Sequence, residues 1–371
     1  MIALPENRPN YRLFGSFRFL LALMVVLSHT WELNFETPSE HLVYQIGLGN
    51  IAVMGFFMLS GYIIAEAVNV FYPGRHFAFL VNRFFRVAPP YWGALAVSLI
   101  THYVLARFGV LRMPDYPVPP GDMFTLANLA VNLTDIFPVV NFNQILPAHP
   151  YYSFVRYAWA VRVEMAFYCA TFAVCWLAAA TRLSLRWLAI AAVSGFLLVH
   201  VTNEYVRHLH WFFGYVPYFC CGVGLYFWQV RRDPLALAGA AVSYVLLVLH
   251  FSGYTQDQHP FSAEWLDGLK KLSVELPLAI TSLIPIVLFA LSKVRVSAGA
   301  KAIDQALGNL SYPLYLNHYP VLVIFMSLGG MGPLVQGAIV LGAVALSAVM
   351  KTLIEAPMTP ARNRLRGTAL D

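Results

Sequence analysis

Two ionisable residues in the first apolar segment of the chain are spaced so that they can act in one site. Arg18 and His29 lie eleven residues apart within the stretch 14–32. At about 100° per residue this spacing puts them within roughly 20° of the same helix face, some 16 Å apart along the axis. A neutral imidazole can accept a proton from a hydroxyl group, which is general-base chemistry. His29 is therefore a candidate catalytic base, although a histidine that hydrogen-bonds between helices for packing explains the pattern equally well.

Two further arginines point to phosphate binding. Arg83 and Arg86 precede the apolar stretch 90–108 at a spacing that puts them on one helix face. Pro89 and Pro90 suit the first turn of a helix, so we predict that a span begins there, with both arginines just outside it. Guanidinium groups bind phosphates through paired hydrogen bonds, so a phosphate-bearing donor such as coenzyme A is a natural ligand. Ordinary anchoring of a span by basic residues is the simpler alternative.

A carboxylate lies inside another apolar stretch. Glu164 follows Trp159 in the segment 158–180, and Tyr168 comes one helical turn later on the same face. A buried carboxylate needs a partner, and polar groups in a membrane are functional candidates by default. Glu164 is thus a second catalytic candidate, and a structural ion pair with Arg162 or Arg156 is the competing interpretation.

Further polar residues lie in apolar stretches at helical spacing. Ser311, Tyr315 and His318 form one stripe in the segment 307–328, where interhelical hydrogen bonding is an alternative role. Ser60 is followed by Gly61, a small pair that allows a close approach. No G-x-S-x-G pattern surrounds Ser60, which argues against a nucleophile.

Composition indicates which elements must position these residues. Of 371 residues, 59% are apolar and only 11% are charged, against roughly 25% charged in soluble chains. The four cysteines all lie in apolar segments without a zinc-like spacing, so we expect no metal site. The net charge is +6, but the basic residues do not gather in a soluble segment that could bind nucleic acid, so no nucleic-acid partner is expected.

The chain is predicted to be an all-α, polytopic integral membrane protein with about ten transmembrane helices in one domain, 1–371. A span needs about 20 mostly apolar residues. The stretches that qualify are 14–32, 44–68, 90–108, 158–180, 187–202, 214–230, 235–252, 273–292, 307–328 and 334–354. With both termini in the cytoplasm, 17 of the 24 Lys and Arg residues fall on the cytoplasmic side, as the positive-inside rule requires.

Six segments, taken together and in order, resemble the membrane acyltransferase 3 family, whose members O-acylate bacterial cell-envelope glycans and some small molecules. The segments span nearly the whole chain. They are Arg18–Leu20 running to His29, Phe56–Tyr62, Arg83–Trp92, Trp159–Tyr168, Ser311–Pro320 and Glu355–Pro357. About 15 residues follow the last predicted span, so a stand-alone form without a fused periplasmic domain is expected.

The resemblance implies roles for these residues. His29 and Glu164 match catalytic positions of the family, and Arg18, Arg83 and Arg86 match positions that bind the acyl-CoA donor, most often acetyl-CoA. We expect the remaining matching residues to bind or orient substrate; they are Ser60, Tyr91, Trp159, Tyr168, Tyr315 and His318. The family's usual W-S-L-S-V-E-E run is changed here, with Ala160 and Arg162 in place of the serines and Met165 in place of the second glutamate.

The resemblance therefore predicts an O-acyltransferase that moves an acyl group from cytoplasmic acyl-CoA to an envelope glycan or lipid-linked sugar. The expected location is the bacterial cytoplasmic (inner) membrane, in contact with lipid. Three alternatives remain. A secondary transporter also suits buried ionisable groups, but no inverted repeat is visible. A member of the other membrane-bound O-acyltransferase family lacks the R-x-x-R arrangement, and an inactive homologue that acts as an assembly partner is compatible with Met165.

Overall fold

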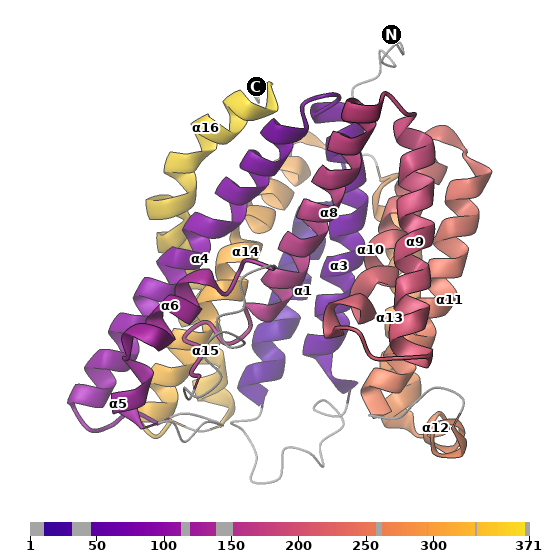
Figure 1. The fold of residues 1–371 in the computed structure, drawn as a ribbon. Coiled ribbons are helices and arrows are strands. Elements are labelled where there is room, and N and C mark those ends of the chain that lie inside the picture. Colours follow the sequence, from indigo (N-terminus) through magenta and orange to yellow (C-terminus); the bar gives the residue numbers. More distant parts are fainter. Residues whose placement is uncertain are drawn as a thin grey trace.

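The computed structural model describes residues 11–31, 46–112, 119–138, 151–256, 262–294, 296–330 and 332–367, and every regular element among them is a helix (Figure 1). The long helices run roughly side by side as one bundle. They are α1 (Phe14–Trp31), α3 (Leu48–Glu66), α4 (His76–Arg107), α8 (Trp159–Thr181), α9 (Leu185–Tyr205), α10 (Val216–Arg231), α11 (Pro234–Gln256), α13 (Leu272–Leu291), α14 (Ala298–Ser327) and α15 (Pro333–Met350). Shorter elements are η2 (Ala67–Phe71), α5 (Pro120–Met123), α6 (Leu126–Thr134), η3 (Trp211–Tyr215), α12 (Ala263–Gly268), η4 (Lys351–Glu355) and α16 (Ala356–Arg366).

The bundle is that of a polytopic membrane protein. In the described part of the chain, six helical stretches are long and apolar enough to cross a bilayer. They are Leu48–Phe71, Trp159–Thr181, Leu185–Tyr205, Pro234–Tyr254, Leu272–Leu291 and Pro333–Arg366. Each of the ten predicted spans overlaps one long helix. The number of transmembrane helices and the cytoplasmic location of both termini stay predictions.

One predicted boundary is wrong. Helix α4 begins at His76 and runs continuously through Pro89 and Pro90, so Arg83 and Arg86 lie within it rather than before it. Proline removes a donor from the helical ladder, but in membrane helices the neighbouring helices can supply hydrogen bonds to freed backbone groups. The prolines leave the carbonyls of Phe85 and Arg86 without a helical donor. The hydroxyl of Tyr312 on α14 donates to the next carbonyl, that of Val87, at 3.1 Å and so ties this turn to α14.

Glycines let four helices approach closely in two pairs, α3 with α10 and α1 with α14. A Cβ at Gly61 of α3 would lie 2.1 Å from the carbonyl oxygen of Phe219 on α10, and one at Gly222 would lie 2.0 Å from that of Met58. Small residues of this kind are the common means of tight packing between membrane helices. On the other side of α3, Gly15 of α1 and Gly308 of α14 face each other in the same way.

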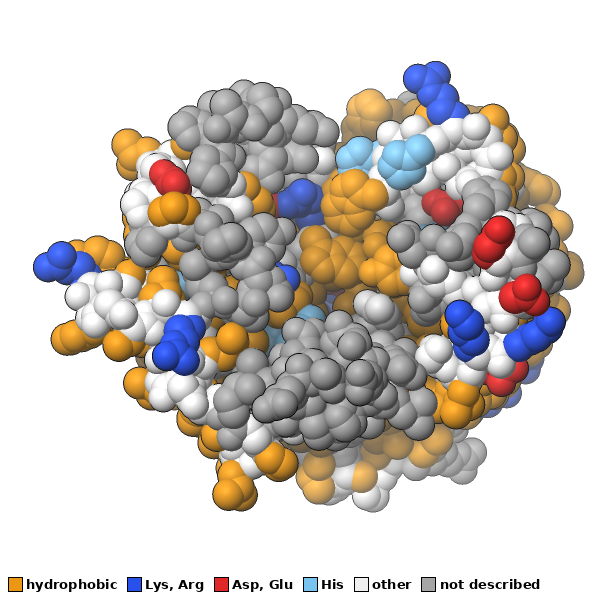
Figure 2. Space-filling model, turned by 90° about the horizontal axis from the view of Figure 1, so that it is seen from below, with side chains coloured by type: hydrophobic (Ala, Val, Ile, Leu, Met, Phe, Trp, Pro, Cys, Tyr) orange, Lys and Arg blue, Asp and Glu red, His pale blue; other side chains and the backbone are white. Residues whose placement is uncertain are grey.

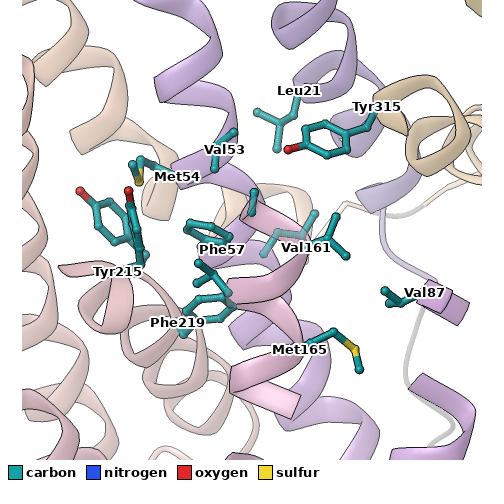
Figure 3. Packing of buried hydrophobic residues seen from close by; sticks show 14 of the residues in the cluster. Leu21, Val53, Met54, Phe57, Val87, Val161, Met165, Tyr215, Phe219 and Tyr315 are labelled. Atoms are coloured by element: carbon teal, nitrogen blue, oxygen red, sulfur yellow. The ribbon is translucent and has the colours of Figure 1, made fainter. Parts of the chain in front are cut away.

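The buried core fills the space between these contacts. Phe57 of α3 packs against Tyr215 of η3 and Phe219 of α10, with ring centroids 5.3 Å and 4.9 Å apart (Figure 3). The first turn of α1 is held by Asp304 of α14, which accepts hydrogen bonds from the backbone N–H groups of Gly15 and Ser16 at 2.9 Å and 2.6 Å. These contacts fix α1, α3, α10 and α14 relative to one another, and α1 carries two of the candidate site residues.

Candidate functional site

Five helices enclose a cavity of about 70 Å³ in the middle of the bundle. Its walls come from α1, α3, α4, α8 and α14, which supply most of the segments that the sequence singled out. The polar side chains that line it are Arg18, Ser60, Arg83, Arg86, Glu164, Tyr168, Ser311, Tyr312 and Tyr315. Seven of these residues, all but Tyr312 and Ser311, were predicted as site residues from the sequence.

Three guanidinium groups share this cavity. Arg18 comes from α1, whereas Arg83 and Arg86 come from one face of α4. The Nε atoms of Arg18 and Arg83 are buried and have no hydrogen-bond partner within the described residues. A buried donor without a partner is costly and rare, so these two N–H groups are available for an anionic acceptor.

Glu164 lies in the same cavity between two hydroxyl donors. Its Oε1 accepts hydrogen bonds from Ser60 Oγ at 2.7 Å and from the Tyr168 hydroxyl at 2.5 Å. The Arg83 guanidinium in turn lies over the Tyr168 ring, 5.5 Å from its centroid. Ser60 of α3, Glu164 and Tyr168 of α8 and Arg83 of α4 therefore form one network of contacts.

Arg162 does not pair with Glu164. It forms a salt bridge with Asp135 instead, and its Nε donates to the Asp135 carbonyl at 2.6 Å. Two residues along a helix turn the side chain by about 200°, so Arg162 and Glu164 point to opposite sides of α8.

The opposite wall of the cavity leads to the two histidines. Tyr315 lines the cavity, and its hydroxyl donates to the carbonyl of Tyr157 at 2.5 Å. The Tyr157 ring stacks on His29 with centroids 3.6 Å apart, and His318 stacks beyond them, 5.5 Å from His29 and 5.1 Å from Tyr157. The structure thus brings His29 and His318 together, at the end of α1 that lies away from Arg18.

The hydrogen bond of His318 defines its tautomer. Its Nδ1 lies 2.8 Å from the Tyr315 carbonyl, which can only accept, so Nδ1 carries the proton of the neutral ring. Its Nε2 then has a free lone pair and is buried without a hydrogen-bond partner among the described residues. An imidazole in this state is ready to accept a proton.

Four predicted residues do not line the cavity: His29 and His318, which stack beside Tyr157, and Tyr91 and Trp159. Tyr91 is buried, and its hydroxyl donates to the carbonyl of Asn132 at 2.5 Å, which ties α4 to the end of α6. Trp159 packs in an aromatic cluster with Trp211 and Tyr215, with ring centroids 6.0 Å and 5.4 Å away. Whether either residue orients a substrate stays a prediction.

Some neighbours of the site were not predicted. Tyr157 lies in a turn within a stretch of several aromatic residues, so nothing in the sequence singles it out. Tyr312 is one of three tyrosines in its segment, and the sequence does not distinguish it from the others. Asp304 is the only carboxylate in its helix, a signal that sequence inspection could have used, because such a group suits the N-terminus of a neighbouring helix. Within the described residues, no set of three or more His, Cys, Asp or Glu side chains is arranged to hold a metal ion.

The surface seen from the end of α1 that carries His29 is hollowed near its centre, where hydrophobic side chains line the depression (Figure 2). Arg18 lies in the first half of α1 and Arg83 and Arg86 in the first half of α4, whereas His29 lies near the last residue of α1. Helix α16 packs along α4 (Figure 1). The arginines thus line the cavity, whereas the stacked histidines lie outside it, beyond Tyr315.

Comparison with protein families gives one match: a family model described as an acyltransferase domain covers residues 15–352. Helix α16 lies beyond the matched residues. Comparisons with curated proteins and with solved structures give no significant match.

Proposed function

Because the chain belongs to the acyltransferase 3 family, we propose that it transfers an acyl group from cytoplasmic acyl-CoA to a hydroxyl group of an envelope or exported glycan. The family makes it a membrane acyltransferase, which removes the main support for the transporter alternative. Acetyl-CoA as donor, a polysaccharide or lipid-linked sugar as acceptor, and the bacterial cytoplasmic membrane as location are parts of the proposal.

One observation carries the proposal. Three guanidinium groups meet at one end of a cavity whose other wall leads to a pair of stacked histidines. Coenzyme A offers several phosphate oxygens, the acceptors that guanidinium groups bind best. Bound there, its acyl end would point toward Tyr315, and the cavity of about 70 Å³ would have to widen to admit the pantetheine arm.

A fourth arginine can contribute to donor binding. Arg362 of α16 interacts electrostatically with Arg83 and Arg86, and its buried Nε has no partner among the described residues. The carbonyl of Arg362 accepts a hydrogen bond from Asn82 of α4 at 2.7 Å, which holds this turn of α16 against α4. We include Arg362 in the proposed donor site.

Glu164 has a positioning role in this proposal. Its Oε1 holds the Tyr168 hydroxyl, and the Tyr168 ring lies under the Arg83 guanidinium. The carboxylate also interacts electrostatically with Arg18 and Arg83, so it offsets part of the repulsion that each of them has with Arg86 when no donor is bound.

The reaction itself needs one base. His29 accepts the proton of the acceptor hydroxyl while that oxygen attacks the thioester carbonyl carbon. The C–S bond then breaks, and the thiolate of coenzyme A leaves and takes up the proton. The stacked rings of Tyr157 and His318 keep the His29 imidazole in one orientation.

The test uses membranes that contain wild type, His29→Gln or His318→Gln at equal abundance. Each receives acetyl-CoA with a radiolabelled acetyl group and an envelope polysaccharide fraction, and label in the polysaccharide is measured. Wild type is expected to transfer label, and His29→Gln is expected to lose at least about a hundredfold in rate.

Two outcomes would contradict the proposal. If wild type transfers no label from acetyl-, succinyl- or longer acyl-CoA donors to any envelope fraction, the proposed reaction is wrong. If His29→Gln transfers label as fast as wild type while His318→Gln does not, the base is His318 and the proposed catalytic role of His29 is wrong.

A further inference from the structure

A second and much larger cavity lies away from the site described above. It encloses about 1280 Å³ between α8, α9, α10 and α11 and also reaches η2 and the turn that follows it. Figure 1 shows α9, α10 and α11 together at one side of the bundle. Drug-sized ligand sites commonly hold about 300–1,000 Å³, so this space is large enough for a bulky amphiphile.

The walls of this cavity are mostly apolar and include several small side chains among larger ones. Along each helix the lining residues recur at three- and four-residue intervals, so one face of each helix is turned to the cavity. The lining faces are Cys175, Ala178 and Ala179 of α8; Ala189, Ile190, Val193 and Leu197 of α9; Cys220, Val223 and Phe227 of α10; and Leu235, Ala238, Gly239 and Val242 of α11. These faces leave space where larger side chains would have packed the four helices together.

Helix α9 shows that protein does not fill this space. Its buried residues are Leu197, His200 and Asn203, all in the second half of the helix. The first half carries the cavity-lining residues Ala189 and Ile190 and has no buried residue. A membrane helix that is packed on protein at only one end must meet lipid along the rest.

Basic side chains gather at one end of the cavity. Arg12, Arg186 and Arg231 line it together with Asp233. Arg12 pairs with Glu66, and Arg186 pairs with Asp233 at 2.9 Å, so these two arginines are neutralised. Arg231 donates to the amide oxygen of Asn69 at 2.5 Å, and no carboxylate pairs with it in the described part of the chain.

From this combination we infer that the cavity between α8, α9, α10 and α11 binds an anionic phospholipid, with its acyl chains on the apolar walls and its phosphate at Arg231. Basic pockets between membrane helices on the cytoplasmic side are typical sites for anionic headgroups. Arg231 lies at the end of α10 that the positive-inside rule predicts to be cytoplasmic, the depth at which a lipid phosphate lies. The inference does not depend on the acyl-transfer reaction.

The position of α8 gives such a lipid a structural consequence. One face of α8 carries Glu164 and Tyr168 toward the first cavity, and its later turns carry Cys175 and Ala178 toward the second. Cys175 lies eleven residues after Glu164 and therefore on the same face of α8, so a lipid that fills the second cavity would contact α8 on that face, about three turns beyond the proposed donor site.

The inference can be tested by native mass spectrometry of the full-length protein in detergent. The probes are phosphatidylglycerol and phosphatidylcholine with identical acyl chains, each titrated onto delipidated protein. Wild type is expected to retain one phosphatidylglycerol more tightly than phosphatidylcholine. Arg231→Gln is expected to raise the Kd for phosphatidylglycerol about fivefold, because one Arg near a lipid phosphate contributes about 1 kcal/mol.

Two matched controls separate this site from general lipid binding. Arg232→Gln removes the neighbouring basic residue, which does not line the cavity, and is expected to leave the Kd unchanged. A Cβ at Gly239 would meet no atom within 4 Å, so Gly239→Ala is expected to leave lipid binding unchanged. Gly239→Leu projects a larger side chain into the cavity and is expected to abolish tight binding of phosphatidylglycerol.

Several outcomes would overturn the inference. Equal retention of phosphatidylglycerol and phosphatidylcholine by wild type would show that the headgroup is not recognised. Equal retention by Gly239→Leu and Gly239→Ala would place the lipid outside the cavity. A co-purified polyprenyl-linked sugar that phosphatidylglycerol cannot displace would make the cavity a site for a different amphiphile.

Discussion

Replacement of Arg83 tests the proposed donor site at its most buried cation. Arg83 is 7% exposed, its Nε has no partner among the described residues, and its guanidinium lies 5.5 Å from the centroids of both Phe79 and Tyr168. The rings hold the guanidinium in place without using its N–H groups. The Nε–H group of Arg83 can therefore donate to a bound phosphate without first breaking a hydrogen bond within the protein.

The expected magnitude follows from this geometry. A hydrogen bond to a charged group contributes about 1.5–3 kcal/mol, and a bidentate contact to phosphate supplies at least one such bond. We expect Arg83→Gln to raise the Kd for coenzyme A by about 2–3 kcal/mol, or roughly 30- to 150-fold. Arg83→Lys keeps the charge but loses the fork, so a loss of about tenfold is expected.

The assay is titration of the detergent-solubilised protein with coenzyme A in a calorimeter. Arg364→Gln is the matched control, because Arg364 is exposed on α16 and its loss is expected to leave the Kd unchanged. Thermal unfolding in the same detergent checks that each variant is folded. A folded Arg83→Gln protein that binds coenzyme A as tightly as wild type would refute the assignment of Arg83 to the donor site.

Three further predictions concern the network and the helix packing. Ser60→Ala removes one of the two donors to Glu164 and is expected to slow acyl transfer about tenfold with little change in stability, because the Tyr168 bond remains; an unchanged rate would remove Ser60 from the site. Asp304→Asn removes the charged acceptor at the start of α1 and is expected to cost about 1–3 kcal/mol, seen as a lower unfolding temperature. Gly222→Ala would place a Cβ 2.0 Å from the carbonyl oxygen of Met58 and is expected to cost about 1–3 kcal/mol, whereas an equal unfolding temperature would show that α3 and α10 can separate freely.

The positions of the helices follow from the sequence because a lipid environment demands long apolar stretches. Each predicted span overlaps a helix. Arg18, Arg83, Arg86 and Glu164 line one cavity, while the roles that the resemblance implies for them stay predictions. The start of α4 was misplaced because proline usually marks the first turn of a helix, whereas here a 32-residue helix continues through Pro89 and Pro90.

Other features depend on tertiary packing and have no local signal. Tyr157 meets His29 only because the turn before α8 folds over the end of α1. Asp304 stabilises a helix that is 289 residues earlier in the chain. The second cavity is lined partly by Ala and Gly residues, which in the sequence also predict close helix packing.

The measurement that tests the central claim most directly is acyl transfer across a sealed membrane. Inside-out vesicles are loaded with the acceptor polysaccharide, and acetyl-CoA with a radiolabelled acetyl group is supplied outside, on the cytoplasmic face. A donor site that opens to the cytoplasm, with His29 as the base, predicts label in the enclosed polysaccharide of wild-type vesicles, and at least about a hundredfold slower labelling with His29→Gln. Label that reaches the polysaccharide only after the vesicles are made permeable would contradict the claim, because donor and acceptor would then meet on the same side.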